Sequence, residues 1–219
     1  MARGRAPGYE EQRELILREA ARLFAELGYP GTSMNQVAQA CGLSKPALYH
    51  YFRDKYDLLV QIAEGHIARL QVLVDEVGAQ ALAPPERLRE LIGRFVREYA
   101  QARDAHRVLT EDVKFLRPED AERILGTERA VVAAFADTIA EQWPQVGQAH
   151  LAKPTTMLLF GMINWMFTWF RPDGSLDYDA MAPVVADLFC GGVTAVKPPQ
   201  GMPAKRRARI RVVPTGASS

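Results

Sequence analysis

The side chains best suited to recognising another molecule lie in a short stretch between Ser44 and Phe52. Leu48 and Phe52 are four residues apart, so in a helix both can face inward. The positions left outward combine a cation, a small methyl group, a phenol and an imidazole: Lys45, Ala47, Tyr49 and His50. Such groups contact base edges and phosphates in a DNA groove. On this pattern alone, an ordinary helical hairpin with solvated polar residues is the alternative interpretation.

No familiar catalytic motif occurs in the sequence. It contains no G-x-S-x-G nucleophile elbow, no H-E-x-x-H zinc motif, no phosphate-binding P-loop and no dinucleotide-binding G-x-G-x-x-G. Metal-ligand spacing is not found among the four histidines, which are His50, His66, His106 and His150. Cys41 and Cys190 lie in apolar helical patterns and are expected to be buried free thiols. We therefore expect no enzyme, no cofactor and no metal site.

The outward-facing groups need a rigid pair of helices to present them, and residues 31–55 can form that pair. Ser33 and Gln36 have capping-box spacing, which predicts that the first helix begins there. Gly42 is placed to end this helix in the left-handed conformation, and Ser44 can cap a second helix. A helix, a glycine-containing turn and a second helix make the helix-turn-helix plan.

This stretch resembles the DNA-binding domain of the TetR family of one-component transcriptional regulators. The resemblance is carried by S-K-P-A-L, Y-H-Y-F and R-D-K, and by A-R-L-F-A-E-L-G-Y at the end of the preceding helix. It covers about residues 10–60 without a gap. Pro46 departs from the family pattern, which often has Gly, Ala or a polar residue there.

The resemblance implies an all-α protein with a three-helix helix-turn-helix domain, followed by a helical domain for ligand binding and dimerisation. The expected boundaries are a flexible arm over 1–9, the DNA-binding domain over 10–54, the ligand-binding and dimerisation domain over 55–196, and a disordered basic tail over 197–219. As a homodimer, the protein would bind a palindromic operator in double-stranded DNA.

Two sets of DNA contacts are expected from this resemblance. Base edges would be contacted by Lys45, Pro46 and Ala47. Phosphates would be contacted by Thr32, Ser33, Ser44, Tyr49, His50 and Lys55. Lys55 matches the family's lysine at a phosphate contact, and it stands at the N-terminus of a long helix, where free N–H groups favour anions.

Charge is distributed unevenly along the chain. Residues 1–55 hold 8 basic and 6 acidic residues, residues 56–196 hold 13 and 20, and residues 197–219 hold 6 basic and none acidic. An acidic body between basic ends suits a protein that meets DNA with one end. The most apolar segment, 155–170, would reach about 24 Å as a helix, short of the roughly 30 Å bilayer core. We expect a buried helix, no membrane span and a cytoplasmic location.

Apolar residues at helical spacing run through residues 55–196, and no alternating strand pattern occurs. Helices are expected over about 55–81, 85–103, 106–116, 118–143, 154–170 and 178–196, with a loop over 144–153. The residues expected to line an effector pocket between them are His66, Phe95, Tyr99, Phe115, Phe135, Met162 and Trp165. A lone histidine in an apolar helix is also commonly a structural residue, so His66 has both interpretations.

The helices over 154–170 and 178–196 are expected to form half of a four-helix dimer interface. The first is apolar on nearly all sides, so it needs cover from more than one direction. The second repeats small residues every four positions. The predicted interface residues are Gly161, Trp169, Ala182, Val185, Ala186, Phe189 and Cys190. An unusually deep monomer core is the alternative.

A second resemblance concerns the effector. The segments M-L-L-F-G-M-I-N-W-M-F-T-W-F-R-P-D-G and A-D-L-F-x-G-G are similar to ligand domains of TetR-like regulators of fatty-acid or aromatic-acid degradation. This implies a small apolar effector, an acyl-CoA or related acid, that swings the long helix and releases a repressor from DNA. The other hypothesis is a helical ligand-sensing or interaction protein that does not bind an operator.

Overall fold

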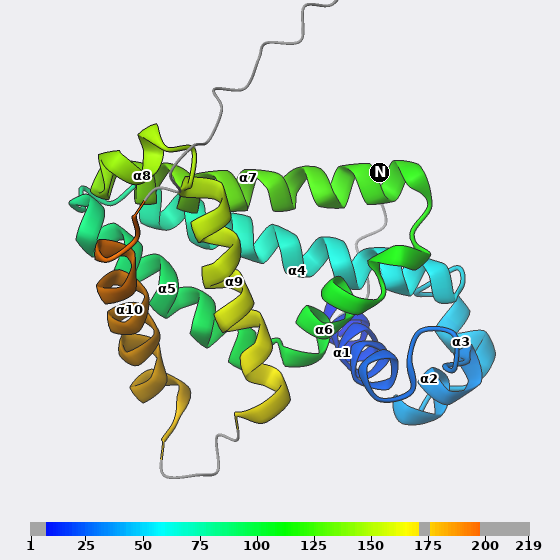
Figure 1. Ribbon diagram of the computed structural model, residues 1–219. Helices are drawn as coiled ribbons and strands as arrows, with labels where there is room; N and C mark the ends of the chain where they lie inside the picture. Colours follow the sequence, from blue (N-terminus) through cyan, green and yellow to red (C-terminus); the bar gives the residue numbers. More distant parts are fainter. Residues whose placement is uncertain (1–7, 171–175, 198–219) are drawn as a thin grey trace, which may run out of the picture.

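The computed structural model describes residues 8–170 and 176–197, and all regular secondary structure within them is helical (Figure 1). The elements are α1 (Tyr9–Leu27), α2 (Met34–Ala40), α3 (Lys45–Tyr49), α4 (Lys55–Gly78), α5 (Pro84–Gln101), α6 (Arg103–Glu111), the 3₁₀ turn η1 (Val113–Phe115), α7 (Pro118–Gln142), α8 (Pro144–Gln148), α9 (Ala152–Trp169) and α10 (Tyr178–Thr194). The predicted all-α class is confirmed. The predicted arm and basic tail lie outside the described residues, apart from residues 8, 9 and 197.

Two details of the predicted helices were wrong. The segment expected to be a loop over 144–153 contains α8, because Pro144 stands at the first position of a helical turn, where its missing N–H costs nothing. The helix expected over 106–116 begins earlier, at Arg103, and its last part is the 3₁₀ turn η1.

The local signals around α2 and α3 are realised as predicted. The Ser33 hydroxyl accepts the Gln36 N–H at 3.3 Å, and the Gln36 side chain accepts the Ser33 N–H at 2.8 Å. The Ser44 hydroxyl accepts the N–H of Ala47 at 3.3 Å. Gly42 has φ +64°, which a residue with a Cβ rarely adopts. These caps define where α2 and α3 begin and how the turn between them runs.

The described residues form two hydrophobic cores, and α4 belongs to both. Its first half supplies Leu58 and Ile62 to the N-terminal core, which also contains Phe24, Leu48 and Phe52. Its second half, from residue 63, packs in the larger C-terminal core. The boundary between the two units therefore falls inside α4, and the helix couples their orientation rigidly.

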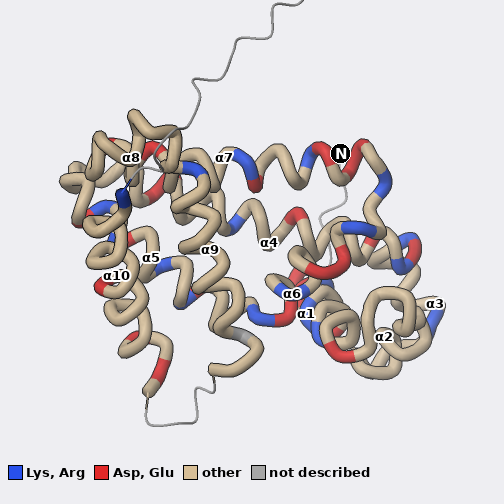
Figure 2. The backbone as a smooth tube through the Cα atoms, in the orientation of Figure 1, with Lys and Arg blue, Asp and Glu red and all other residues tan. Residues whose placement is uncertain are grey.

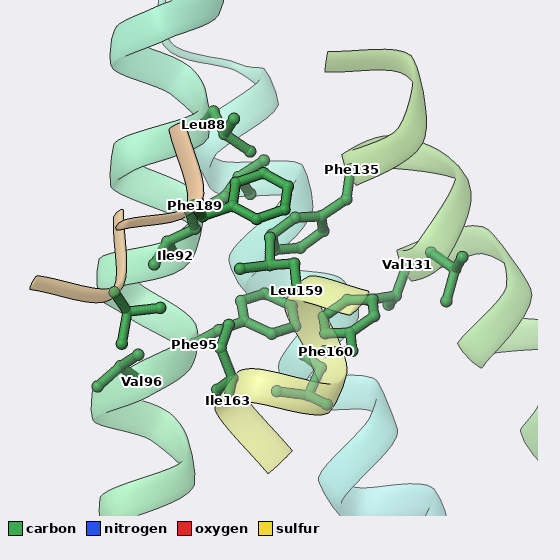
Figure 3. Close-up of a cluster of buried hydrophobic side chains, with 14 of the residues drawn as sticks. Leu88, Ile92, Phe95, Val96, Val131, Phe135, Leu159, Phe160, Ile163 and Phe189 are labelled. Atoms are coloured by element: carbon green, nitrogen blue, oxygen red, sulfur yellow. The ribbon is translucent and has the colours of Figure 1, made fainter. Parts of the chain in front are cut away.

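Aromatic rings fill the centre of the C-terminal core (Figure 3). The Phe95 ring on α5 packs edge-on against Phe135 of α7, with centroids 4.8 Å apart, and Phe135 packs at 4.9 Å against Phe160 of α9. Phe189 of α10 lies in the same cluster. Three helices are thus held together by contacts between three rings, with α10 closing the group.

The structure corrects the predicted dimer interface on α10. The side chains of Ala182, Val185, Ala186 and Phe189 are at most 6% exposed, because this face of α10 packs against α5 of the same chain. Cys190 is half-buried at the edge of that core and is a free thiol, as is the half-buried Cys41. The predicted face is therefore interior to the protomer.

Helix α6 joins the two cores over a single turn. Val108 is 1% exposed and belongs to the N-terminal core, whereas its neighbour Leu109 belongs to the C-terminal core. In keeping with this, α6 packs against both α1 and α4. A displacement of α6 would therefore change the packing of both hydrophobic cores.

Truncating Phe95 tests the role of the ring cluster. We expect Phe95→Ala to lower the free energy of unfolding by about 3–5 kcal/mol, because it leaves a cavity between three helices. Leu27→Ala is the matched control, since Leu27 is 50% exposed, and it should cost well under 1 kcal/mol. Urea denaturation measures both, and equal losses would contradict this account of the core.

Candidate DNA-binding surface and ligand cavity

The exposed edge of α3 carries most of the side chains expected at DNA. Ser44, Lys45, Pro46 and His50 are exposed, and Tyr49 is 45% exposed. On the opposite side, Leu48 is fully buried and anchors the helix. Ala47 is half-buried between these faces. Lys45 is the one charged residue in α3, and α2 has none (Figure 2), so the edge is polar with a single cation at its start.

Thr32 does not belong to this surface. Its side chain is 2% exposed, and its hydroxyl donates to the carbonyl oxygens of Leu23 at 3.1 Å and Gly28 at 3.0 Å. The predicted phosphate contact by this hydroxyl is therefore wrong: Thr32 ties the end of α1 to the loop that precedes α2. Ser33, by contrast, is exposed.

Lys55 also has a structural role in place of the predicted phosphate contact. Its ammonium donates to the carbonyl oxygens of Tyr29 at 2.7 Å, Thr32 at 2.8 Å and Pro30 at 3.3 Å. An ammonium has three N–H donors, so these contacts use all of them. The group also lies 4.4 Å from the centroid of the Tyr29 ring, and burial lowers the pKa of Lys55.

The N-terminus of α4 is capped by the protein's own carboxylate. Asp54 Oδ1 accepts the Asp57 N–H at 2.7 Å, so one N–H group at the predicted anion site already has an acid as its partner. The exposed cation beside it is Arg53, whose side chain is 87% exposed and whose guanidinium lies 3.6 Å from Asp57. Arg53 therefore has an exposed cationic side chain at this end of α4, whereas the ammonium of Lys55 is engaged by backbone carbonyls.

Phe115, predicted in the ligand pocket, lies instead at the joint between the two units. Its ring is 5.4 Å from that of Tyr29, in the loop before α2. Nearby, the carboxylate of Asp112 accepts a hydrogen bond from the backbone of Tyr29, which opposes the rise in the pKa of Asp112 caused by burial. Residues at the end of α6 and in η1 therefore contact the loop over residues 29–32, which Lys55 also contacts.

A cavity of about 190 Å³ lies between α4, α5, α6, α7 and α9. Its described lining residues are Ile67, Leu70, Tyr99, His106, Leu109, Thr110, Val113, Glu128, Val131, Val132, Met157, Phe160 and Asn164. This volume would hold about six water molecules and is below the range typical for drug-sized ligands. The cavity therefore suits a small ligand or the small end of a larger one.

Of the seven predicted pocket residues, Tyr99 is the one that lines this cavity. His66 does not line the cavity but contacts His106, which does. Phe95 and Phe135 are buried in the ring cluster, and half-buried Met162 packs on the core. Trp165 is 66% exposed on the outside of α9, so its assignment to the pocket was wrong.

Sequence reasoning missed a set of lining residues on one stretch of chain. His106, Leu109, Thr110 and Val113 are spaced at i, i+3, i+4 and i+7 and share a helical face. That spacing was readable in the sequence, but it does not distinguish a cavity wall from a packed core.

His66 and His106 form a buried pair beside the cavity. His66 Nε2 lies 3.1 Å from His106 Nδ1, and the two side chains are 0% and 3% exposed. The Tyr99 ring stacks on His106, with centroids 3.7 Å apart and an interplanar angle of 21°. The second interpretation of His66, as a satisfied structural residue, is thus nearer the structure, with His106 as its partner 40 positions away.

Burial keeps this pair uncharged. Burial, with the nearby His106 and Arg69, lowers the pKa of His66 to about 3. Burial likewise lowers the pKa of His106 to about 4, against an opposing effect from the Asn164 side chain. Burial raises the pKa values of two other lining residues, Tyr99 and Glu128. Near neutral pH, both imidazoles are neutral and each carries one N–H.

The part of the chain that the structure describes holds neither a metal-binding cluster nor a membrane-spanning helix. No group of three or more His, Cys, Asp or Glu residues there is arranged to hold a metal ion. Within the same residues, every helix is too short or too polar to cross a bilayer.

Comparisons with known proteins identify both halves of the chain. Residues 16–62 match the model of bacterial regulatory proteins of the tetR family, and residues 81–193 match that of a tetracyclin repressor-like C-terminal domain. A solved TetR-family transcriptional regulator from Bordetella parapertussis is 33% identical with a TM-score of 0.80, over 86% of this chain and 99% of that one.

Two further relatives carry more specific names. AibR, solved in complex with isovaleryl coenzyme A and operator DNA, is 26% identical with a TM-score of 0.69, over 81% of this chain and 97% of AibR. The transcriptional activator FasR from Mycolicibacterium smegmatis is 24% identical over 195 residues, which are 89% of this chain and 88% of FasR.

The buried histidine pair predicts a loss of stability in acid. Between about pH 6.5 and pH 4, an unfolded chain protonates His106 but the folded chain does not, so the free energy of unfolding falls as pH falls. Each such group contributes about 1.4 kcal/mol per pH unit in that window. In urea denaturation at pH 7, 6 and 5, His106→Gln should therefore lose less stability than the native chain. Parallel losses would contradict the assignment.

Proposed function

The chain belongs to the TetR family of transcriptional regulators, and we propose that it is a homodimeric repressor that leaves its palindromic operator when a small apolar effector binds. Members of this family are DNA-binding regulators and not enzymes. The observation that carries the proposal is the polar edge of α3, presented by a buried anchor at Leu48 and by side-chain caps at Ser33 and Ser44. Such a regulator acts in the cytoplasm.

The proposed DNA contacts follow the exposure of the side chains. Lys45, Pro46 and Ala47 reach base edges as α3 enters a major groove. Ser33, Ser44, Tyr49 and His50 contact phosphates at its sides, and Arg53 supplies the second cation in place of Lys55. Phosphate contacts of this kind fix the position of the helix, and base contacts provide the sequence selectivity.

The proposed dimer interface is the outer surface of α9 and α10, with a second copy of the chain as its occupant. Large apolar side chains gather there: Leu158 is 71% exposed, Trp165 and Leu188 are 66%, and Trp169 is 56%. An exposed apolar patch of this kind marks an interaction site. A Cβ added at Gly161 or Gly191 would meet nothing within 4 Å, so both leave room for the close approach of another helix.

For the effector, we propose an acyl-CoA whose acyl group enters the 190 Å³ cavity. Apolar side chains from α4, α6, η1, α7 and α9 make up most of the described lining, which suits a short hydrocarbon group. AibR has been solved in complex with isovaleryl coenzyme A and operator DNA, which supports this ligand class for the present chain by analogy.

Two elements can carry the effector's influence to α3. Helix α4 begins directly after the helix-turn-helix and supplies Ile67 and Leu70 to the cavity. Helix α6 supplies His106, and its far end reaches Tyr29 through Asp112 and Phe115. Release requires that the effector bind better to the arrangement of these helices that does not fit DNA.

A matched pair of variants tests DNA binding by gel shift on the region upstream of the protein's own gene. Arg53→Met should leave the thermal melt unchanged and reduce the slope of log affinity against log salt by about 0.9, the value for one lost phosphate contact. Lys55→Met should lower stability by about 1.5–3 kcal/mol through its carbonyl contacts and leave that slope unchanged.

The reverse pattern would return the phosphate contact to Lys55. If the native protein does not retard the upstream duplex, operator binding there is wrong. Tighter retardation on adding isovaleryl-CoA would make the protein a corepressed regulator or an activator, and weaker retardation is the expected result.

A charged residue introduced on the outer surface of α9 tests the proposed dimer interface. We expect Trp165→Glu to convert the dimer to monomer at micromolar concentration, because a carboxylate would be buried without a partner. Native mass spectrometry reports the mass. Val72→Glu, at a 52% exposed position on α4, is the control and should leave a dimer. A dimer that survives Trp165→Glu would exclude this surface.

A further inference from the structure

The 190 Å³ cavity has an apolar inner part and a more polar mouth. Ile67 on α4 and Phe160 on α9 line it and are at most 6% exposed. Thr110 on α6 is exposed, Met157 on α9 is 50% exposed, and Glu128 on α7 is half-buried. The buried apolar residues therefore form the inner wall, and Thr110, Glu128 and Met157 lie toward the mouth.

Glu128 is the one acidic side chain among the described lining residues, and neither Lys nor Arg occurs among them. Burial raises the pKa of Glu128, and the charge of the adjacent Arg129 opposes that rise. The Arg129 guanidinium forms its ion pair with Glu122 instead. Within the part of the chain that the structure describes, the carboxylate of Glu128 thus makes no hydrogen bond or ion pair.

The Glu128 carboxylate lies on the cavity side of α7. Tyr99 lines the cavity from α5, and its pKa is raised by burial and then by the negative charge of Glu128. A charge acts on a buried phenol in this way only when the two groups are near each other. The cavity therefore presents a hydrogen-bond acceptor that has no donor of its own.

This acceptor restricts which ligand groups fit beside it. A partly buried carboxylate without a donor is costly, and a ligand N–H group placed there would reduce that cost. A ligand carboxylate offers no donor and brings a like charge into a cavity without a cation. An uncharged N–H group meets the requirement without the desolvation cost of an ammonium.

A coenzyme A thioester has such a group at a suitable place. The first amide N–H of its thiol arm is separated from the sulfur by two methylene groups. When the acyl group occupies the inner apolar part of the cavity, the arm leaves through the mouth and this amide passes Glu128. The corresponding free acid ends in a carboxylate at the same place.

We propose that the Glu128 carboxylate accepts a hydrogen bond from the amide N–H of the effector's thiol arm, so that the cavity selects an acyl thioester over the free acid. This inference rests on the proposed effector site. Glu128 is the specificity-determining residue, because it attracts the amide and repels a carboxylate. Since α7 packs against α4, the same bond ties the ligand to a neighbour of the helix that leads to α3.

Two probes of nearly equal shape isolate this hydrogen bond. S-(2-acetamidoethyl) 3-methylbutanethioate carries the amide, and S-(2-acetoxyethyl) 3-methylbutanethioate has an ester oxygen in place of the N–H. Calorimetry on the full-length protein at pH 8, where ionised carboxylate is favoured, gives the ratio of their affinities. We expect the amide-to-ester ratio to be about tenfold higher for the native protein than for Glu128→Met, the effect of one hydrogen bond to a partly solvated charged group.

Two further variants control this comparison. Glu128→Gln keeps the shape and a neutral acceptor, so its ratio should lie between those of the native protein and Glu128→Met. Glu119→Met removes an exposed carboxylate from the first turn of α7, outside the cavity lining, and should leave the ratio unchanged. The thermal melt of each variant should remain cooperative.

The free acid supplies an independent readout. We expect 3-methylbutanoate to bind the native protein more weakly than either thioester and to bind Glu128→Met more tightly than the native protein. A native ratio retained in Glu128→Met or Glu128→Gln, tightest binding by 3-methylbutanoate, or no binding of any probe would each overturn the proposal. Tightest binding by 3-methylbutan-1-amine would assign the cavity to a cationic ligand and would overturn it as well.

Failure here and failure of the proposed function are distinguishable. Retardation of the upstream duplex by the native protein does not depend on Glu128, so a repressor with another ligand chemistry would still pass the gel shift. Conversely, a chain that binds the amide probe through Glu128 but does not retard DNA would keep this inference and lose the operator.

Discussion

The contact of the Lys55 ammonium with three carbonyl oxygens is the interaction on which the arrangement of the two units depends. It joins the first residue of α4 to the loop over residues 29–32, and that loop leads directly into α2. These hydrogen bonds are charge-assisted, and such bonds are stronger than those between neutral groups. With Phe115 and Asp112 holding Tyr29 from the side of α6, one short loop is positioned by both halves of the protein.

Features decided within a few residues could be predicted from the sequence, and features decided by distant neighbours could not. The caps at Ser33 and Ser44 and the left-handed Gly42 depend on local geometry and were placed correctly. The role of Lys55 depends on carbonyls more than twenty positions earlier. Pattern reasoning identified a cation near a helix N-terminus but could not show that protein atoms would take all its donors.

The dimer surface and the histidine pair illustrate two further limits. On α10, Ala182 and Ala186 are apolar, and so are Leu188 and Gly191 on the exposed side, so composition alone could not decide which face packs on α5. His66 was judged as a single residue, although its chemistry is that of a pair with His106. A helix that is apolar on most sides is expected to be covered on those sides. Which neighbour covers which side depends on tertiary packing and cannot be predicted from the helix alone.

Helices α4 and α6 pack in both hydrophobic cores, so they connect the cavity physically to the DNA-binding surface. Coupling between sites needs an element with two arrangements that both sites can bias. Helix α6 is in contact with both regions, because His106 lines the cavity and Val108, two residues on, is buried in the N-terminal core.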